Sequence, residues 1–96
     1  MDKHNFPKVR SVKAMSNYTL IVTFDNQVKK QYDCTRLLKN PLYQLLREIA
    51  FFKNVNIDAG GYGISWNDDL DLSEYELWSN GTEIKHEKAE AEIIHN

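Results

Sequence analysis

The stretch that decides the fold is "YTLIVTFDNQVKKQY", from Tyr18 to Tyr32. Its first seven residues are mostly β-branched or aromatic, which is typical of a β-strand. The alternate residues Tyr18, Leu20, Val22 and Phe24 are apolar, while the intervening positions are mixed. This pattern indicates an antiparallel sheet with one face on a core. "DNQ" then predicts a hairpin turn, because Asp and Asn tolerate left-handed backbone angles, and "VKKQY" predicts the returning strand.

Upstream, "KVRSVKAM" (residues 8–15) predicts a further strand that begins after Pro7 and ends at an Ser–Asn turn. The first part of the chain therefore predicts a three-stranded antiparallel meander. In its third strand Lys30 shares a face with Val28 and Tyr32. We expect this strand at the sheet edge, where the ammonium of Lys30 reaches water.

Downstream, an Asn–Pro pair begins a predicted helix over Pro41–Ala50. Its apolar residues recur with helical spacing, so we expect them to form one stripe against the sheet. They are Leu42, Leu45, Leu46 and Ile49. Two further strands are predicted at residues 54–57 and 62–66, with glycines in the turn between them.

The segment from Gly60 to Gly81 concentrates glycines, tryptophans and acids. Ser73 and Glu76 have the spacing of a capping box, and the Asn–Gly pair at its end fits the end of a short helix. A calcium loop beginning at Asp69 would need Gly at its sixth position and Glu at its twelfth, and neither is present. We therefore expect no metal site and read these residues as turn and cap chemistry.

Length and composition indicate one small domain, residues 1–82, followed by a charged tail, residues 83–96, that is a frayed helix or disordered. No apolar run is long enough to span a bilayer, and the first residues lack a signal peptide's apolar core, so we expect a cytoplasmic protein.

No residue pattern points to catalysis. Cys34 is the only cysteine, and the three histidines lie near the termini without metal-ligand spacing. We expect Cys34 to be a small, partly buried residue rather than a nucleophile. The sequence thus predicts a protein that is not an enzyme and has no cofactor.

Charge is unevenly distributed along the chain. Residues 1–39 carry eight Lys/Arg and three Asp, whereas residues 40–96 carry four Lys/Arg and eleven Asp/Glu. Either the two halves neutralise each other in the fold, or the basic strands contact nucleic acid. The candidate residues for that alternative are Lys8, Arg10, Lys13, Lys29 and Lys30. The sequence pI of about 5.9 argues against a strong electrostatic footprint.

Exposed aromatic side chains are candidates for protein binding. We expect Trp66 in the core, and we take Trp78, Tyr75 and Tyr62 as candidate partner-binding residues.

The order of these features resembles the bacterial family catalogued as domain of unknown function 2442. The resemblance covers about residues 6–82. It is carried by Pro7, Val9, Tyr18, Leu20, Val22, Phe24, Asp25, Asn26, Tyr32, Asp33, Leu37, Trp66, Asp68, Asp71, Leu72, Leu77, Asn80 and Gly81. Gln27 departs from the family pattern, in which this turn position is usually glycine.

The resemblance implies a two-layer α+β fold: a three-stranded antiparallel meander, a helix, two further strands and a short C-terminal helix. It implies no established activity. Family members often accompany another small protein in arrangements that resemble toxin–antitoxin or phage-defence pairs. Some members carry a following helix-turn-helix domain, for which the tail here is too short.

Our leading hypothesis is therefore a non-enzymatic protein-interaction domain, the antitoxin-like or accessory member of a two-protein system, that binds a neighbouring-gene product. Contact would be through an edge strand, the first or the fifth, or through the helix that carries Trp78. A homodimer through the same edge is a further option. The alternative is a small nucleic-acid-binding regulator.

Overall fold

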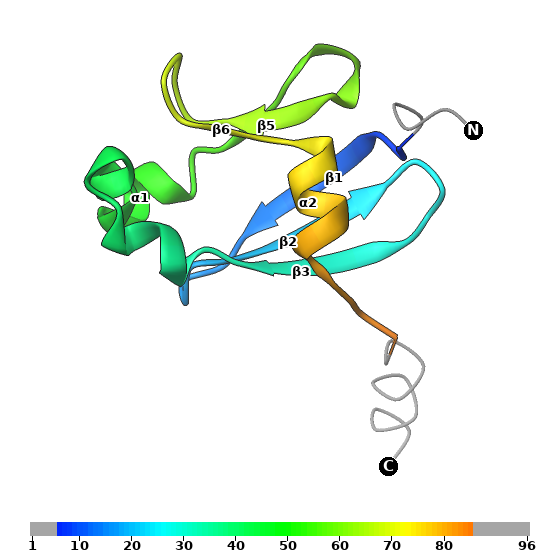
Figure 1. Ribbon diagram of the computed structural model, residues 1–96, viewed down its shortest axis with the longest axis horizontal. Helices are drawn as coiled ribbons and strands as arrows, with labels where there is room; N and C mark the ends of the chain where they lie inside the picture. The colour runs from blue at the N-terminus through cyan, green and yellow to red at the C-terminus, as the bar shows by residue number, and fades with distance from the viewer. Residues whose placement is uncertain (1–5, 86–96) are drawn as a thin grey trace.

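The computed structural model describes residues 6–85 and has two layers (Figure 1). The main sheet has the strand order β1-β2-β3-β7, and all neighbouring strands are antiparallel. Its strands are β1 (Val9–Ala14), β2 (Thr19–Phe24), β3 (Lys29–Asp33) and β7 (Thr82–Glu83). The helix α2 (Glu74–Asn80) crosses one face of this sheet (Figure 1). The predicted α+β class and the three-stranded meander are confirmed.

The central hairpin forms as its alternation predicts from Leu20 onward, whereas Tyr18, which was predicted to begin the strand, precedes β2 with a φ of 64°. The side chains of Leu20, Val22 and Phe24 are fully buried, because this face of the main sheet packs against the second layer, which contains the helices and a smaller sheet. The turn differs in detail from the prediction, since the left-handed residue is Gln27, with φ of 73°, and not the preceding Asp or Asn. Its N–H donates to the carbonyl of Phe24 at 2.9 Å. Gln27 thus occupies a conformation that glycine adopts without steric cost.

The region predicted as one helix over Pro41–Ala50 is divided. It contains the 3₁₀ segment η2 (Pro41–Arg47), which is kinked at Tyr43 with φ of −102° and ψ of 19°. A break at Glu48, with φ of −77° and ψ of 112°, separates it from one turn of α-helix, α1 (Ile49–Phe52). A shorter 3₁₀ helix, η1 (Thr35–Lys39), precedes them. The prediction of a continuous α-helix is therefore wrong.

The predicted buried stripe on this segment is also wrong, for a geometric reason. The backbone is kinked at Tyr43 and breaks at Glu48, so the regular helical spacing on which the stripe depends is interrupted. Leu42 and Leu45 are 58% and 53% exposed, whereas Leu46 is fully buried. Ile49, after the break, is 37% exposed. The segment therefore contributes a single leucine to the core and presents others to solvent.

A second, smaller sheet has the order β4-β5-β6. Its strands are β4 (Asn56–Ile57), β5 (Gly63–Ser65) and β6 (Asp71–Ser73), and the 3₁₀ turn η3 (Ala59–Gly61) joins the first two. The sequence did not predict β6. Because β5 pairs on both sides, it is not an edge strand, and the expectation that the fifth strand offers a free edge is wrong.

The chain passes from α2 directly into β7 at Gly81. This glycine has an ordinary φ of −78°, but a Cβ there would lie 2.6 Å from the Leu77 carbonyl oxygen and 3.1 Å from Cβ of Lys30. Its lack of a side chain therefore allows β7 to pair with β3. This pairing means that β3 is not the sheet edge at Lys30, contrary to our expectation. Residues 86–96 of the predicted tail lie outside the described residues.

The core lies between the two layers. Trp66 is 6% exposed, as predicted, and its indole N–H donates to the Phe52 carbonyl at 2.8 Å. Tyr18 reaches the same region with a positive φ of 64°: its ring packs 5.1 Å from that of Phe52, and its hydroxyl donates to the Arg47 carbonyl. Among residues 6–85, the helices lack the length and apolar composition needed to cross a membrane.

Candidate protein-interaction surface

Two of the three candidate aromatic residues lie together at one end of α2. Tyr62, after η3, is 60% exposed, and Tyr75, in the first turn of α2, is 54% exposed. Phe6 packs edge-on against Tyr75, with ring centroids 4.9 Å apart and an interplanar angle of 69°. We call this surface the aromatic corner and define it as Phe6, Lys8, Tyr62, Glu74 and Tyr75.

Lys8 connects the parts of the aromatic corner. Its ammonium lies 4.9 Å from the centroid of the Tyr62 ring, 3.5 Å from Oε2 of Glu74 and 2.7 Å from the Phe6 carbonyl oxygen. A cation over an aromatic face attracts the ring electrostatically, and the ion pair holds the ammonium there. The N-terminal segment, η3 and α2 are thereby joined through one side chain.

The backbone beneath Tyr62 depends on two glycines with φ of 76°, Gly60 and Gly61. A Cβ on Gly61 would lie 2.5 Å from the carbonyl oxygen of Val9, so the chain can approach β1 this closely only as glycine. The Tyr62 carbonyl then accepts a hydrogen bond from the Glu74 N–H at 3.0 Å. The turn predicted from these glycines therefore sets where Tyr62 lies relative to α2.

The start of α2 has the Ser73 half of the predicted capping box, but not the reciprocal half, because the Glu76 carboxylate binds a different donor. Oγ of Ser73 accepts a hydrogen bond from the Glu76 N–H at 3.0 Å, as a Ser N-cap does. The Glu76 carboxylate accepts the Tyr32 hydroxyl at 2.7 Å, which ties α2 to β3. Burial, followed by this hydrogen bond, raises the pKa of Tyr32, so the phenol stays protonated as the donor.

Trp78, the third candidate, lies one helical turn from Tyr75 and is half-buried. Its ring packs edge-on against Phe24, with centroids 5.1 Å apart, and the Lys30 ammonium lies 3.9 Å from its centroid. Lys30 also donates to the Trp78 carbonyl near the end of α2, where a cation is favoured by the helix dipole. Trp78 therefore holds α2 on the sheet.

The five basic residues proposed for nucleic-acid contact do not form one surface. Lys8 lies in the aromatic corner and Lys30 lies under α2. Lys13 pairs with Ile21 across β1 and β2, and Lys29 pairs with Thr23 across β2 and β3. These two lie on the face of the sheet opposite the buried side chains, and Arg10 is exposed at an irregularity in β1.

The acidic residues Asp68 and Asp69 lie in the turn before β6, and Asp71 lies in β6 itself. Oδ1 of Asn67 accepts hydrogen bonds from the N–H groups of Asp69 and Leu70, both at 2.8 Å, while Asp68 and Asp69 are exposed. In the part of the chain that the structure describes, no three His, Cys, Asp or Glu side chains are grouped as metal ligands. All three histidines lie outside that part.

Cys34 is fully buried between β3 and η1. Burial, with a smaller contribution from Asp33, raises the pKa of its thiol to about 12. Because the thiolate is the nucleophile, this thiol is unreactive at neutral pH. The prediction that Cys34 is structural is consistent with this environment, although it is more deeply buried than expected.

Two features of the exposed surface, one in the aromatic corner and one in η2, had no clear signal in the sequence. Phe6 precedes the first strand in a polar segment, and only the tertiary fold places it against Tyr75. The exposed leucines of η2 were predicted to be core residues.

Fold and surface together define a small α+β domain with an ordered, solvent-exposed aromatic cluster. The chain belongs to the family described as Protein of unknown function (DUF2442), whose model matches residues 9–83. No curated protein and no solved structure matches the chain significantly.

Proposed function

We propose that this protein is a non-enzymatic interaction domain that binds another protein through the aromatic corner. Its biological setting in this proposal is the cytoplasm of a bacterium, as the antitoxin-like or accessory member of a two-protein system. The single observation that carries the proposal is that Tyr62 and Tyr75 are each more than half exposed and yet held in place by Lys8 and Phe6.

Such tyrosines suit protein binding for two physical reasons. A tyrosine buries a large area at low entropic cost, since it has few rotatable bonds, and it offers a hydroxyl at its tip. Contacts between Tyr62 and Lys8, and between Tyr75 and Phe6, restrict the rings before a partner arrives. Pre-organisation of this kind lowers the cost of association.

The nucleic-acid alternative is less favoured. Two of its five residues, Lys8 and Lys30, are engaged by Glu74 and Trp78, so their charges are partly committed within the fold. The exposed residues Arg10 and Lys13 remain candidates for phosphate contacts. A homodimer is a further alternative, and the oligomeric state of the purified chain distinguishes it from binding of a different protein.

Comparative affinity purification from the protein's own cell tests the proposal. The tagged wild type is compared with Tyr62→Ala/Tyr75→Ala and with a matched control, Leu42→Ala/Leu45→Ala, which removes exposed apolar groups elsewhere. We expect a near-stoichiometric protein with wild type and control, and at least about a tenfold loss with the tyrosine variant, as for hot-spot residues.

Three outcomes would overturn this proposal. The partner could be retained by the tyrosine variant, or lost only with the leucine control. Alternatively, the purified material could contain nucleic acid in place of a protein and lose it on charge reversal of Arg10 and Lys13. Circular dichroism of each variant establishes that the fold is intact.

A further inference from the structure

A second exposed apolar surface lies on the part of the chain that joins the two sheets. We call residues 35–53, which contain η1, η2 and α1, the leucine segment. Figure 1 shows it in green around α1, at the end of the molecule opposite the turn between β2 and β3. Leu42 and Leu45 are more than half exposed, and Ile49 is more than a third exposed. Exposed apolar groups that are gathered in this way mark a surface that contacts a protein or a membrane.

The backbone of the leucine segment is fixed, so its exposed side chains are held at the surface. Leu46 and Phe52 are fully buried and anchor the segment in the core. The Phe52 carbonyl accepts the indole N–H of Trp66 at 2.8 Å, and the Arg47 carbonyl accepts the hydroxyl of Tyr18. The exposed leucines therefore cannot move into the core without breaking these contacts.

The leucine segment is basic, in contrast to the rest of the described chain. It carries four Lys/Arg and one Glu, whereas the other residues of 6–85 carry six Lys/Arg and nine Asp/Glu. Its four basic side chains are all exposed: Arg36, Lys39, Arg47 and Lys53. Positive charge beside exposed leucines is complementary to a surface of anionic lipid headgroups above an apolar layer.

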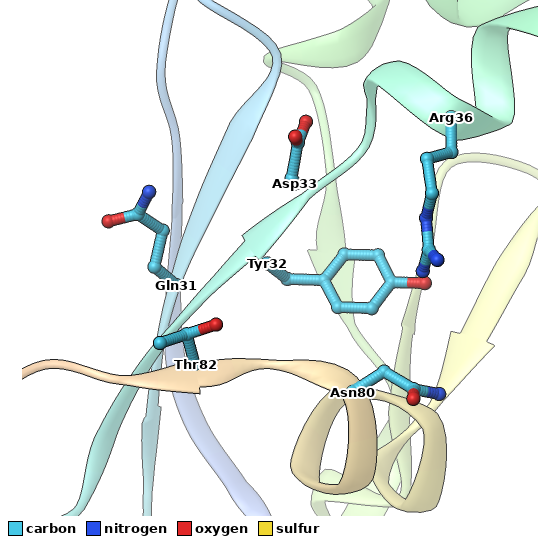
Figure 2. A pocket seen from close by; sticks show the side chains of 6 residues that line it. All are labelled: Gln31, Tyr32, Asp33, Arg36, Asn80 and Thr82. Atoms are coloured by element: carbon cyan, nitrogen blue, oxygen red, sulfur yellow. The ribbon is translucent and has the colours of Figure 1, made fainter.

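One of these basic residues also belongs to a different surface. Arg36 borders a polar hollow of about 410 Å³, and in Figure 2 its guanidinium lies beside the hydroxyl of Tyr32. The exposed carboxylate of Asp33 borders the same hollow, so the charge of Arg36 has a neighbour of opposite sign. Lys39 and Lys53 do not line this hollow and are the better test of the positive charge of the leucine segment.

The composition of the leucine segment favours a bilayer over a folded protein as its partner. Leucine is under-represented among the residues that dominate protein–protein affinity, in which Tyr, Trp and Arg are enriched. Surface-bound membrane segments, in contrast, combine leucines with Lys and Arg, and a fluid apolar layer accepts aliphatic side chains without a complementary pocket. The exposed acids Asp68 and Asp69 lie on the turn before β6, outside the segment, and this turn has to stay in water.

We propose that the leucine segment docks on the anionic surface of a lipid bilayer, with its exposed aliphatic side chains below the headgroups and its lysines beside lipid phosphates. The inserted residues are Leu42, Leu45 and Ile49, and the lysines are Lys39 and Lys53. The segment lies on the bilayer and does not span it, because η2, its longest element, has seven residues. The aromatic corner is a different surface, so this proposal stands whether or not that corner binds a partner.

Vesicle flotation of the purified full chain tests the proposal. The probes are vesicles of phosphatidylcholine alone and of phosphatidylcholine mixed with an equal amount of anionic phosphatidylglycerol. At about 0.1 M salt, where only charges within about 10 Å interact strongly, we expect the wild type to float with the anionic vesicles. Binding to the neutral vesicles should be at least about tenfold weaker.

Paired variants separate the two parts of the proposed contact. Leu42→Ala/Leu45→Ala should bind the anionic vesicles about tenfold more weakly, because it removes apolar surface that would enter the bilayer. Lys39→Gln/Lys53→Gln should weaken this binding by at least about tenfold, because each lysine near the headgroups contributes to it. The matched controls remove two aromatic rings or two exposed charges elsewhere and should leave binding unchanged. They are Tyr62→Ala/Tyr75→Ala and Arg10→Gln/Lys85→Gln.

An environment-sensitive fluorophore shows which surface touches the bilayer. Because the native thiol of Cys34 is buried, a thiol introduced by Leu45→Cys can be labelled selectively. The emission of this label should shift to the blue on addition of anionic vesicles, since it leaves water. The same label on Tyr75→Cys, in the aromatic corner, should show no shift.

Four results would overturn the proposal. The wild type could fail to float with anionic vesicles, or float equally with neutral ones. The leucine or the lysine variant, with circular dichroism that shows an intact fold, could bind as the wild type does. The label at Leu45 could stay in water while the protein floats. Finally, sedimentation velocity without lipid could show a dimer that Leu42→Ala/Leu45→Ala dissociates, in which case the leucines join two copies of the chain.

Discussion

The sharpest prediction concerns two neighbouring leucines in η2, which helical periodicity places on the same buried stripe. Leu46 is fully buried, so Leu46→Ala should lower the free energy of unfolding by about 2–5 kcal/mol. Leu45 is 53% exposed, so less than half of the roughly 1.5–3 kcal/mol for burying a leucine is at stake. Leu45→Ala should therefore cost at most about 1.4 kcal/mol.

Urea denaturation followed by tryptophan fluorescence, to which Trp66 and Trp78 both contribute, measures both changes in the free energy of unfolding. In a domain of this size about 1 kcal/mol shifts the melting temperature by roughly 4–8 °C, so Leu46→Ala should melt at least about 8 °C below wild type. Leu46→Met, which conserves volume, should cost less than about 1.5 kcal/mol. Equal losses for Leu45→Ala and Leu46→Ala would show that this segment is a regular amphipathic helix and refute the 3₁₀ account.

Three further predictions follow from single groups. Gln27→Gly should stabilise the protein by roughly 0.5–1 kcal/mol in urea titrations, because it relieves a left-handed glutamine, and a loss would contradict the turn geometry. Gly61→Ala should destabilise more than Gly60→Ala in the same assay, because its Cβ meets the Val9 backbone whereas that of Gly60 meets a ring that can move. Burial raises the pKa of the Cys34 thiol from 9.0 to about 12 in the folded state. The contribution of this buried, protonated thiol to stability is therefore present below pH 9 and declines as the pH rises toward 12. Cys34→Ala should flatten this decline in denaturation measured from pH 8 to 11, and an unchanged slope would disprove the assignment.

The meander was predictable because its information is local. The alternation from Leu20 to Phe24 and the polar turn after it lie within a few residues of one another, so they indicate the hairpin without reference to distant segments. The N-cap at Ser73 was likewise readable from spacing alone. These elements agree with the structure because propensity, pattern and packing favour the same conformation.

The prediction of a helix over Pro41–Ala50 is wrong because the backbone leaves helical geometry at Tyr43 and at Glu48, which the spacing of the leucines does not reveal. The spacing of its leucines fits 3.6 residues per turn, but the chain breaks at Glu48, next to the Arg47 carbonyl that accepts the hydroxyl of Tyr18. A hydrogen bond between residues so far apart in sequence leaves no periodic signal. The edge position of Lys30 failed in the same way, since β7 comes from the end of the domain.

The sequence indicated which aromatic residues would form the candidate surface, but it did not indicate how they come together in the fold. Exposed Tyr62 and Tyr75 were proposed from their aromatic chemistry. Their connection through Phe6 and Lys8 joins three segments that are remote in sequence, and the pairing of Lys8 with Glu74 is one local case in which the basic first half neutralises the acidic second half.

Site-specific photocrosslinking in the cell tests the central claim most directly. A benzophenone amino acid placed at Tyr62 or at Tyr75 should yield one discrete, higher-mass protein adduct, because a partner there lies against the probe. The same amino acid at the exposed Leu42 should yield none. Adducts from Leu42 alone, or no protein adduct from either tyrosine position in correctly folded protein, would contradict the aromatic corner as the binding surface.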